Sequence, residues 1–314
     1  MMLSRIADSL YWLDRYMERT DGILRTLRTE FVLSLDKSSH ETASWRPVLH
    51  MFTQAEEDHL QRLEYNTSDA LHYIIADTSN TNSLRALLTR ARENARGAQD
   101  NITKEVWEQV NHVYHSVNSP AMQRKLEGQE ALPLLDELTH MVTLYKGVTG
   151  STMPRSLGWS FMNLGKYMER SMITLEMSNR FLADIRYNLD ETRDILYWRK
   201  LLLSLSGYEL HLKTYRNTNY TQNVTDQVLF NRQFTRSIRY ALDKLGHYLE
   251  DVTENNNPAG KEELNRAFGR LRCKVQYADL DQVREIHPEK FLQEIRHQLI
   301  HFNKLLTQVF FSYA

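Results

Sequence analysis

Two short segments combine glutamate with arginine, the pairing that acid–base chemistry and anion binding both use. Residues 15–19 read RYMER and residues 166–170 read KYMER. A carboxylate can transfer a proton, and guanidinium groups beside it can hold another carboxylate or a phosphate through paired hydrogen bonds. Glu18 and Glu169 are therefore the candidate catalytic residues. The candidate binding residues in these two segments are Arg15, Arg19 and Arg170.

A structural role is the alternative for the same two segments. On a helix, side chains three or four positions apart share a face, so Glu18 neighbours Asp14, Arg15 and Asp21. Charged groups placed beside an apolar stripe can form ion pairs that fix the register of packed helices. The sequence thus leaves two interpretations of Glu18 open, a polar site that binds a ligand or an ion-pair network inside a bundle.

A second polar cluster lies in residues 90–111, RARENARGAQDNITKEVWEQVN. Arg92 and Arg96 are four residues apart, and Glu93 lies three residues before Arg96, so all three share one helical side. Arginine forks suit carboxylates and phosphates. The cluster could therefore bind a peptide carboxylate or the acidic surface of a partner. Alternatively, its arginines pair with Glu18, Glu169, Glu105 and Glu108 in a buried network. The candidate binding residues in this segment are Arg92, Glu93, Asn94, Arg96, Glu105 and Glu108.

Sequence motifs for other chemistries are absent. The sequence has neither a GxxxxGK nor a GxGxxG loop, so we expect no nucleotide site in this chain, and no GxSxG elbow is present. A di-iron helical bundle needs Glu-x-x-His pairs. Such pairs occur at Glu56–His59 and Glu137–His140, and His297 and His301 lie four residues apart. With 12 histidines in the chain, chance pairs are expected, and we predict no bound metal.

Composition narrows the class of protein further. The 314 residues contain 39 Lys and Arg against 40 Asp and Glu, which leaves no excess positive charge for a nucleic-acid backbone. The single cysteine, Cys273, excludes an intramolecular disulfide and a cysteine-cluster metal site. No run of eighteen apolar residues is present, and early charges interrupt the N-terminus. We therefore expect a cytoplasmic protein that binds neither nucleic acid nor membranes.

The elements that carry these side chains should all be helices. Apolar residues recur at three- and four-residue spacings, glycine (11) and proline (6) are scarce, and no alternating strand pattern appears. Ser83 and Thr103 are candidate N-caps. We expect an all-α bundle of about ten helices. The expected helices include residues 45–62, 67–76, 119–146 with a break near Pro133, 154–182, 190–216, 233–255, 261–277 and 289–312.

The charged segments also mark an internal repeat. Tyr16 aligns with Tyr167 at an offset of 151 residues, and at this offset Glu18 meets Glu169 and Leu24 meets Leu175. We predict one domain over residues 1–314, built from pseudo-repeated halves at 1–150 and 151–314. Gly147–Gly150 would separate the two halves.

Four motifs together resemble the bacterial Alpha-E family. MLSRIADSLYWLDRYMER, from Met2 to Arg19, is similar to the family's N-terminal pattern. ARENAR, from Ala91 to Arg96, is similar to its central pattern, which continues through Ile102, Glu105, Trp107, Glu108 and Asn111. Its mid-chain pattern is matched by Thr152, Met153, Arg155, Trp159 and Phe161 before LGKYMER, and FTRSI follows at 234–238. Through these matches Arg155 and Arg236 join the binding candidates. Thr235 departs from the proline common at that position, which puts a rigid turn there in doubt.

The resemblance implies a context for the protein. Alpha-E proteins tend to be encoded beside a circularly permuted ATP-grasp amidoligase and a transglutaminase-like cysteine peptidase, and some are fused to such a ligase. ATP and Mg²⁺ would then belong to the partner ligase. We therefore expect an accessory or binding subunit for a peptide, an amino acid or a partner protein. The alternatives are an enzyme that uses Glu18 and Glu169 on an amide or amino-acid substrate, and a metal-binding helical bundle.

Overall fold

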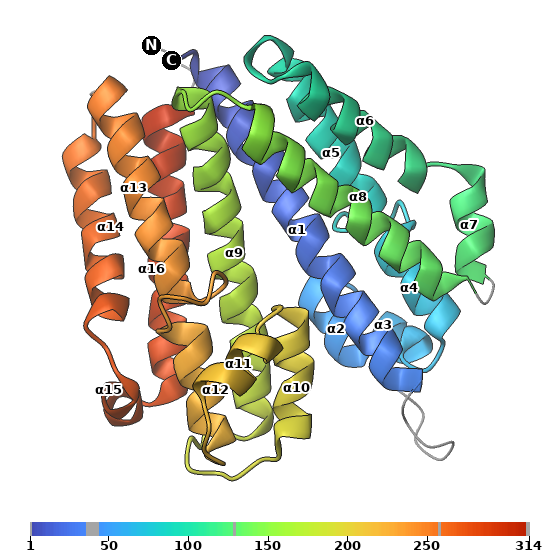
Figure 1. The fold of residues 1–314 in the computed structure, drawn as a ribbon, viewed down its shortest axis with the longest axis vertical. Helices are drawn as coiled ribbons and strands as arrows, with labels where there is room; N and C mark the ends of the chain where they lie inside the picture. The colour runs from blue at the N-terminus through green and yellow to red at the C-terminus, as the bar shows by residue number, and fades with distance from the viewer. Residues whose placement is uncertain (1, 36–43, 128–129, 257–258, 312–314) are drawn as a thin grey trace. The chain divides into compact units, whose positions relative to one another are not determined.

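The computed structural model describes residues 2–35, 44–127, 130–256 and 259–311, and within these ranges the regular structure is helical throughout (Figure 1). The described ranges contain sixteen α-helices and one short 3-10 helix. The all-α prediction is confirmed, whereas the expected number of about ten helices is too low. The reason for the larger number is local, because several expected helices are divided by turns of a few residues.

Three of these divisions account for most of the difference. The helix expected over 45–62 is α2 (Arg46–Phe52) followed by α3 (Glu57–Leu63). The stretch 190–216 is α10 (Ile195–Ser204) followed by α11 (Tyr208–Thr214), and 119–146 is α7 (Pro120–Glu127) followed by α8 (Ala131–Thr152). A short helix not expected at all, α15, spans Leu280–Ile286. The break expected near Pro133 falls between Glu127 and Ala131, so Pro133 lies inside α8. Apolar spacing continues across the turns after Phe52 and Ser204, so periodicity alone does not reveal those two divisions.

The predicted separator Gly147–Gly150 is wrong, because α8 continues through both glycines to Thr152. The helix ends at Thr152, the backbone of the C-cap residue Met153 is extended, and Pro154 follows. A Cβ added at Gly147 or Gly150 would meet no neighbouring atom within 4 Å, so neither glycine is required by close packing. Glycine weakens a helix by about 1 kcal/mol, but burial of the apolar face of α8 outweighs that cost.

The chain divides into two compact units, one of residues 1–11 and 155–314 and the other of residues 12–154. In the first unit the helices after α10 and α11 are α12 (Tyr220–Leu229), α13 (Ile238–Asn256), α14 (Lys261–Gln276), α15 and α16 (Pro288–Phe310). The long helix α9 (Leu157–Asp184) packs against α13 and α16, and α14 lies beside α16 (Figure 1). Phe161, Phe291 and Phe302 are fully buried in this unit.

The second unit contains most of α1 (Ser4–Leu35), then α2 and α3, α4 (Thr67–Ile75), α5 (Leu84–Gly97), α6 (Lys104–Val117), α7 and α8. Here α6 packs against both α5 and α8 (Figure 1). The predicted caps of α5 and α6 are confirmed: the Ser83 hydroxyl accepts a hydrogen bond from Ala86 N at 3.2 Å, and Thr103 does the same for Val106 N at 3.4 Å.

Several contacts recur in the two units. The indole of Trp45 donates to Thr67 Oγ1 of α4 at 3.0 Å, and the indole of Trp198 donates to Thr221 Oγ1 of α12 at 3.3 Å. Both tryptophans are buried. Helix α14 contacts α13 and α16 just as α6 contacts α5 and α8. An internal duplication would leave such matches, and the pseudo-repeat stays a prediction.

Candidate functional site

Three carboxylates lie on one face of α1. Asp14, Glu18 and Asp21 occupy positions i, i+4 and i+7, so the helix brings them into one row. All three are buried, and only 2% of the surface of Glu18 is exposed. Because an unpaired buried carboxylate is costly, this row needs cations or hydrogen-bond donors from a neighbouring element.

Two consecutive residues of α8, Tyr145 and Lys146, supply a hydrogen-bond donor and a cation to this row of carboxylates. The Lys146 ammonium lies 3.1 Å from Glu18 Oε2 and 2.8 Å from Asp21 Oδ2. Arg25, one turn further along α1, adds a second cation at 2.9 Å from Asp21 Oδ2. Lys146 thus bridges two carboxylates of α1. Since it lies in α8, this contact joins the two helices.

Tyr145 completes the polar row at its N-terminal end. Its hydroxyl donates to Asp14 Oδ1 at 2.5 Å. Burial, together with the charge of Asp14, raises the pKa of Tyr145 well above its usual range, so the hydroxyl stays protonated and remains a donor. We refer to Asp14, Glu18, Asp21, Tyr145 and Lys146 as the α1–α8 network. In this conformation, the burial of Glu18 leaves a dissolved substrate no access to its carboxylate.

The arginine that follows each motif glutamate donates a hydrogen bond to the turn that precedes a helix. Arg19 Nη1 donates to Asn82 Oδ1 at 3.2 Å, immediately before the N-cap Ser83 of α5. Arg170 Nη1 donates to the carbonyl oxygen of Thr235 at 3.2 Å, two residues before Ser237. The Ser237 hydroxyl accepts from Tyr240 N at 3.0 Å, at the start of α13. These two arginines therefore have a clear positioning role in the fold.

The remaining motif residues are Arg15 on α1, Glu169 on α9, Arg155 just before α9 and Arg236 just before α13. Glu169 is buried in α9. The Arg15 guanidinium lies 4.5 Å from the ring centroid of Trp12, and Arg155 lies 3.8 Å from that of Trp159. The backbone oxygen of Arg236 accepts from Thr174 Oγ1 at 2.8 Å. Two of these arginines thus stack on indole rings, a contact that suits the planar guanidinium.

The ARENAR segment forms an exposed surface on α5 and α6. Arg92 Nε donates to Asn111 Oδ1 at 2.6 Å, and its guanidinium lies 4.9 Å from the Tyr114 ring centroid and 5.6 Å from that of Trp107. Glu93 pairs with Arg96 at 2.5 Å, and 64% of the Arg96 side chain is exposed. We call Arg92, Glu93, Arg96, Trp107 and Tyr114 the arginine–aromatic surface.

The alternative in which Arg92 and Arg96 join Glu18 in a buried network is wrong. Their partners are Glu93, Asn111 and aromatic rings on the surface of α5 and α6. Asn94 donates to the backbone oxygen of Arg90 at 2.9 Å, Glu108 pairs with Lys104 at 3.4 Å, and Glu105 is exposed. Among the candidates, Arg15, Glu18, Glu169 and Arg170 are buried on α1 and α9, whereas Glu93, Arg96, Glu105 and Glu108 are exposed on α5 and α6. Arg19, Arg92, Asn94 and Arg236 are half-buried, and Arg155 is exposed just before α9.

Sequence reasoning placed Asp14 and Asp21 beside Glu18 but nominated neither, and it missed Tyr145 and Lys146. Helical spacing carries the signal for the two aspartates. Nothing local points to Lys146, because α8 begins about a hundred residues after α1 ends. Only the packing of the two helices brings this lysine to Glu18.

Within the described ranges, no group of three or more His, Cys, Asp or Glu side chains is arranged to hold a metal ion. Glu137, from one Glu-x-x-His pair, instead forms an ion pair with Lys125 at 2.8 Å. His59, from the other pair, packs on the Tyr73 ring at a centroid distance of 4.7 Å. Among the helices that the structure describes, none combines the length and the apolar character needed to cross a bilayer.

Comparison with known proteins assigns the family. A family model described as a predicted alpha-helical domain with a conserved ER motif matches residues 2–311. The chain belongs to the Alpha-E family. Two Glu-Arg pairs occur in this Alpha-E chain, at 18–19 and 169–170, and in both the glutamate is buried while the arginine bonds to the turn before a helix.

The related proteins carry no assigned activity. An uncharacterised protein of Mycobacterium bovis and one of Mycobacterium tuberculosis are each 21% identical over 323 residues, which cover 97% of this chain. The match covers 36% of each relative, so this Alpha-E chain spans about a third of their length. No solved structure matches the chain.

Proposed function

We propose that this Alpha-E chain is an accessory or binding subunit of an ATP-grasp amidoligase system, and that it engages a peptide or the partner ligase through the arginine–aromatic surface. The observation that carries the proposal is the placement of Arg92, which is partly exposed, held by Asn111 and stacked beside Trp107 and Tyr114. The link to an amidoligase rests on the family context described above.

The composition of this surface favours binding. Arginine, tryptophan and tyrosine are the residue types most enriched at the energetic centres of protein interfaces. The hydrogen bond to Asn111 and the ring contacts already restrict Arg92, so less side-chain entropy is lost when a partner binds. The exposed Glu93–Arg96 pair beside it would form the polar rim of such an interface.

The buried α1–α8 network does not favour the enzyme alternative. An acid–base residue must come within hydrogen-bonding distance of the group that gains or loses the proton. Glu18 is buried and paired with Lys146, which is the environment of a structural carboxylate. We therefore assign the α1–α8 network to packing and the arginine–aromatic surface to recognition.

The test is co-purification from the native cell followed by a functional assay. The tagged chain should retain an ATP-grasp ligase, identified by mass spectrometry, and should raise the rate of ATP-dependent amide formation by that ligase. The double variant Arg92→Ala, Arg96→Ala should lose both effects. Because an interface hot-spot residue contributes about 2 kcal/mol or more, the Kd for the ligase should rise at least roughly thirtyfold.

Arg193→Ala is the matched control. Arg193 pairs with Glu191 at 2.7 Å and lies 5.7 Å from the Tyr197 ring centroid, a similar chemical environment on a different element. This variant should bind the ligase as the wild type does. Purification of the chain without any ligase, or equal loss of binding in both variants, would contradict the proposal.

A further inference from the structure

A pocket of about 340 Å³ lies between α6, α7 and α8, and none of its lining residues is among the candidate residues nominated from the family motifs. Its lining comes from three successive elements: His112, His115 and Ser116 of α6, Ser119 before α7, Ala121, Met122 and Lys125 of α7, and Leu134, Glu137 and Leu138 of α8. This volume is near the lower end for ligand pockets, so a ligand that fills it would be small.

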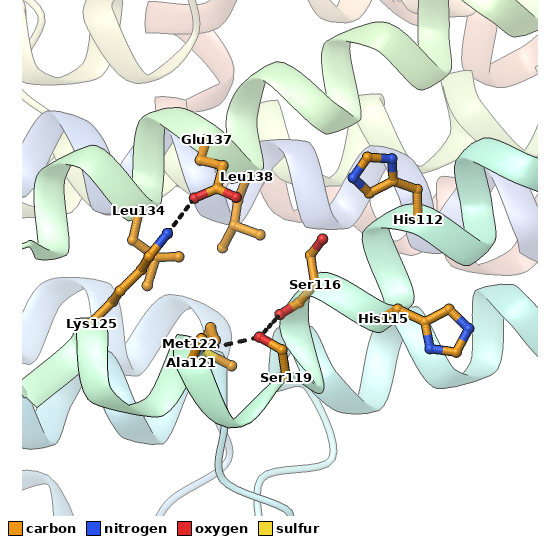
Figure 2. Close-up of a pocket in the computed structure, with 10 residues that line it drawn as sticks. All are labelled: His112, His115, Ser116, Ser119, Ala121, Met122, Lys125, Leu134, Glu137 and Leu138. Atoms are coloured by element: carbon orange, nitrogen blue, oxygen red, sulfur yellow. Dashed lines mark hydrogen bonds and ion pairs between the residues drawn. The ribbon is translucent and has the colours of Figure 1, made fainter.

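The pocket presents both charges side by side. The Lys125 ammonium lies 2.8 Å from the Glu137 carboxylate. Figure 2 shows the two groups meeting at one side of the pocket. The side chains are 37% and 44% exposed, so water screens the pair and a ligand can separate it at low cost. The hydrogen bond from Lys125 to Glu137 raises the pKa of that lysine, which therefore stays charged at neutral pH.

The rest of the lining is apolar at the base of the pocket and polar on the side opposite the Lys125–Glu137 pair. Met122, Leu134 and Leu138 are buried and supply the apolar contacts. His112 lies across the pocket from the Lys125–Glu137 pair, and Ser116 lies between them (Figure 2). Ser119 is already used at the start of α7, where its hydroxyl donates to Ser116 O and accepts from Met122 N.

Two polar groups in this lining are available to a ligand. In the part of the chain that the structure describes, neither the Ser116 hydroxyl nor the His112 imidazole makes a hydrogen bond. They lie four residues apart on α6 and so share a face of that helix. A ligand carboxylate held by Lys125 could gain a further donor from either group.

We propose that this pocket binds a free α-amino acid with an aliphatic side chain. The ligand's carboxylate would pair with Lys125 and its ammonium with Glu137, so that one zwitterion satisfies both charges. Its side chain would lie against Met122, Leu134 and Leu138. This ligand matches the three features of the lining, namely adjacent opposite charges, an apolar base and unused donors. The inference goes beyond the proposed function, since it concerns another surface and needs no partner protein.

The test uses leucine and two analogues, each of which lacks one charge. 4-Methylpentanoate lacks the ammonium and 3-methylbutylamine lacks the carboxylate. With the full chain labelled with ¹⁵N at histidine, leucine should shift the imidazole signal of His112, identified by its loss in His112→Asn. Because each charge contributes a charge-assisted hydrogen bond, we expect either analogue to bind about tenfold or more weakly than leucine.

Two variants test the contributions of the two pocket charges separately. Lys125→Met should weaken leucine binding about tenfold or more. Glu137→Gln should weaken leucine binding but not 4-methylpentanoate binding, because this variant removes the carboxylate that competes for Lys125. Since the two variants differ in which ligand they affect, a general loss of folding cannot imitate the pattern. Thermal unfolding followed by circular dichroism confirms that each variant is folded.

Lys274→Met is the matched control. Lys274 of α14 also forms an ion pair with a glutamate of the next long helix, Glu294 of α16, and lies 5.4 Å from the Phe291 ring centroid. This variant should bind leucine as the wild type does. The proposal is overturned if leucine up to tens of millimolar leaves the His112 signal unmoved, or if Lys125→Met binds leucine as well as Lys274→Met does. Binding of the partner ligase is measured separately, so either proposal can fail alone.

Discussion

Replacing Lys146 with methionine should destabilise the protein far more than the same replacement at Lys104. Methionine keeps the length and apolar stem of lysine but removes the ammonium. At position 146 this leaves Glu18 and Asp21, both buried, without the cation that lies 3.1 and 2.8 Å from their oxygens. Helix propensity changes little, because lysine and methionine are similar helix formers.

The magnitude follows from burial. Removing one partner of a buried ion pair costs about 3–5 kcal/mol, since the other charge stays buried without a partner. The Lys146 side chain is 24% exposed, so some water reaches it and we expect about 3 kcal/mol. Lys104 pairs with Glu108, but their side chains are 82% and 60% exposed. Loss of that pair should cost less than about 1 kcal/mol.

The assay is urea unfolding of both variants, followed by circular dichroism and by tryptophan fluorescence, with the unfolding free energy extrapolated to water. A third variant, Lys146→Met with Asp21→Asn, should recover part of the loss because it removes one of the two buried carboxylates that Lys146 bridges. Equal destabilisation by Lys146→Met and Lys104→Met would refute the assignment of the α1–α8 network to packing. So would a fully stable Lys146→Met chain that, unlike the wild type, fails to stimulate the proposed partner ligase.

Three further predictions concern α10 to α12. Ser206→Gly should raise the unfolding free energy by about 0.5 kcal/mol in urea titrations, because Ser206 has a φ of 54°. Gly207→Ala should instead lower it by about 1–3 kcal/mol, since the added Cβ would lie 2.8 Å from Gln227 Nε2 and from Phe234 Cζ. Burial lowers the pKa of His211, and the hydrogen bond with Gln227 offsets only part of this decrease. As the pH falls, His211 therefore becomes protonated in the unfolded chain before it does so in the folded chain. The stability contributed by neutral His211 should be complete above pH about 6.5 and should be lost as the pH falls toward the lowered pKa. His211→Gln should therefore reduce the dependence of the unfolding free energy on pH between about pH 7 and 5, measured by urea unfolding at each pH. An unchanged pH dependence in this variant would contradict the assignment.

Features that depend on neighbouring residues could be predicted from the sequence more reliably than features that depend on packing between distant segments. Caps depend on one side chain and the backbone three residues later, so Ser83 and Thr103 could be identified from sequence alone. The helix breaks after Phe52 and Ser204 could not be identified, because the apolar spacing continues through both turns. Glycine is a weak stop signal inside a well-packed helix, and Gly147 illustrates this.

The same distinction between local and distant features applies to the residues of the candidate site. Sequence determined that Glu18 shares a helical face with Asp14 and Asp21, because a 3.6-residue turn fixes that relation, and family motifs identified the residues of ARENAR. Tertiary structure alone decided that Glu18 is buried against Lys146 while Arg92 stays at the surface. Helical periodicity orients side chains about one axis, whereas burial depends on which helix packs against that face. For α1 that helix is α8, which lies far away in the chain and comes close only when the bundle folds.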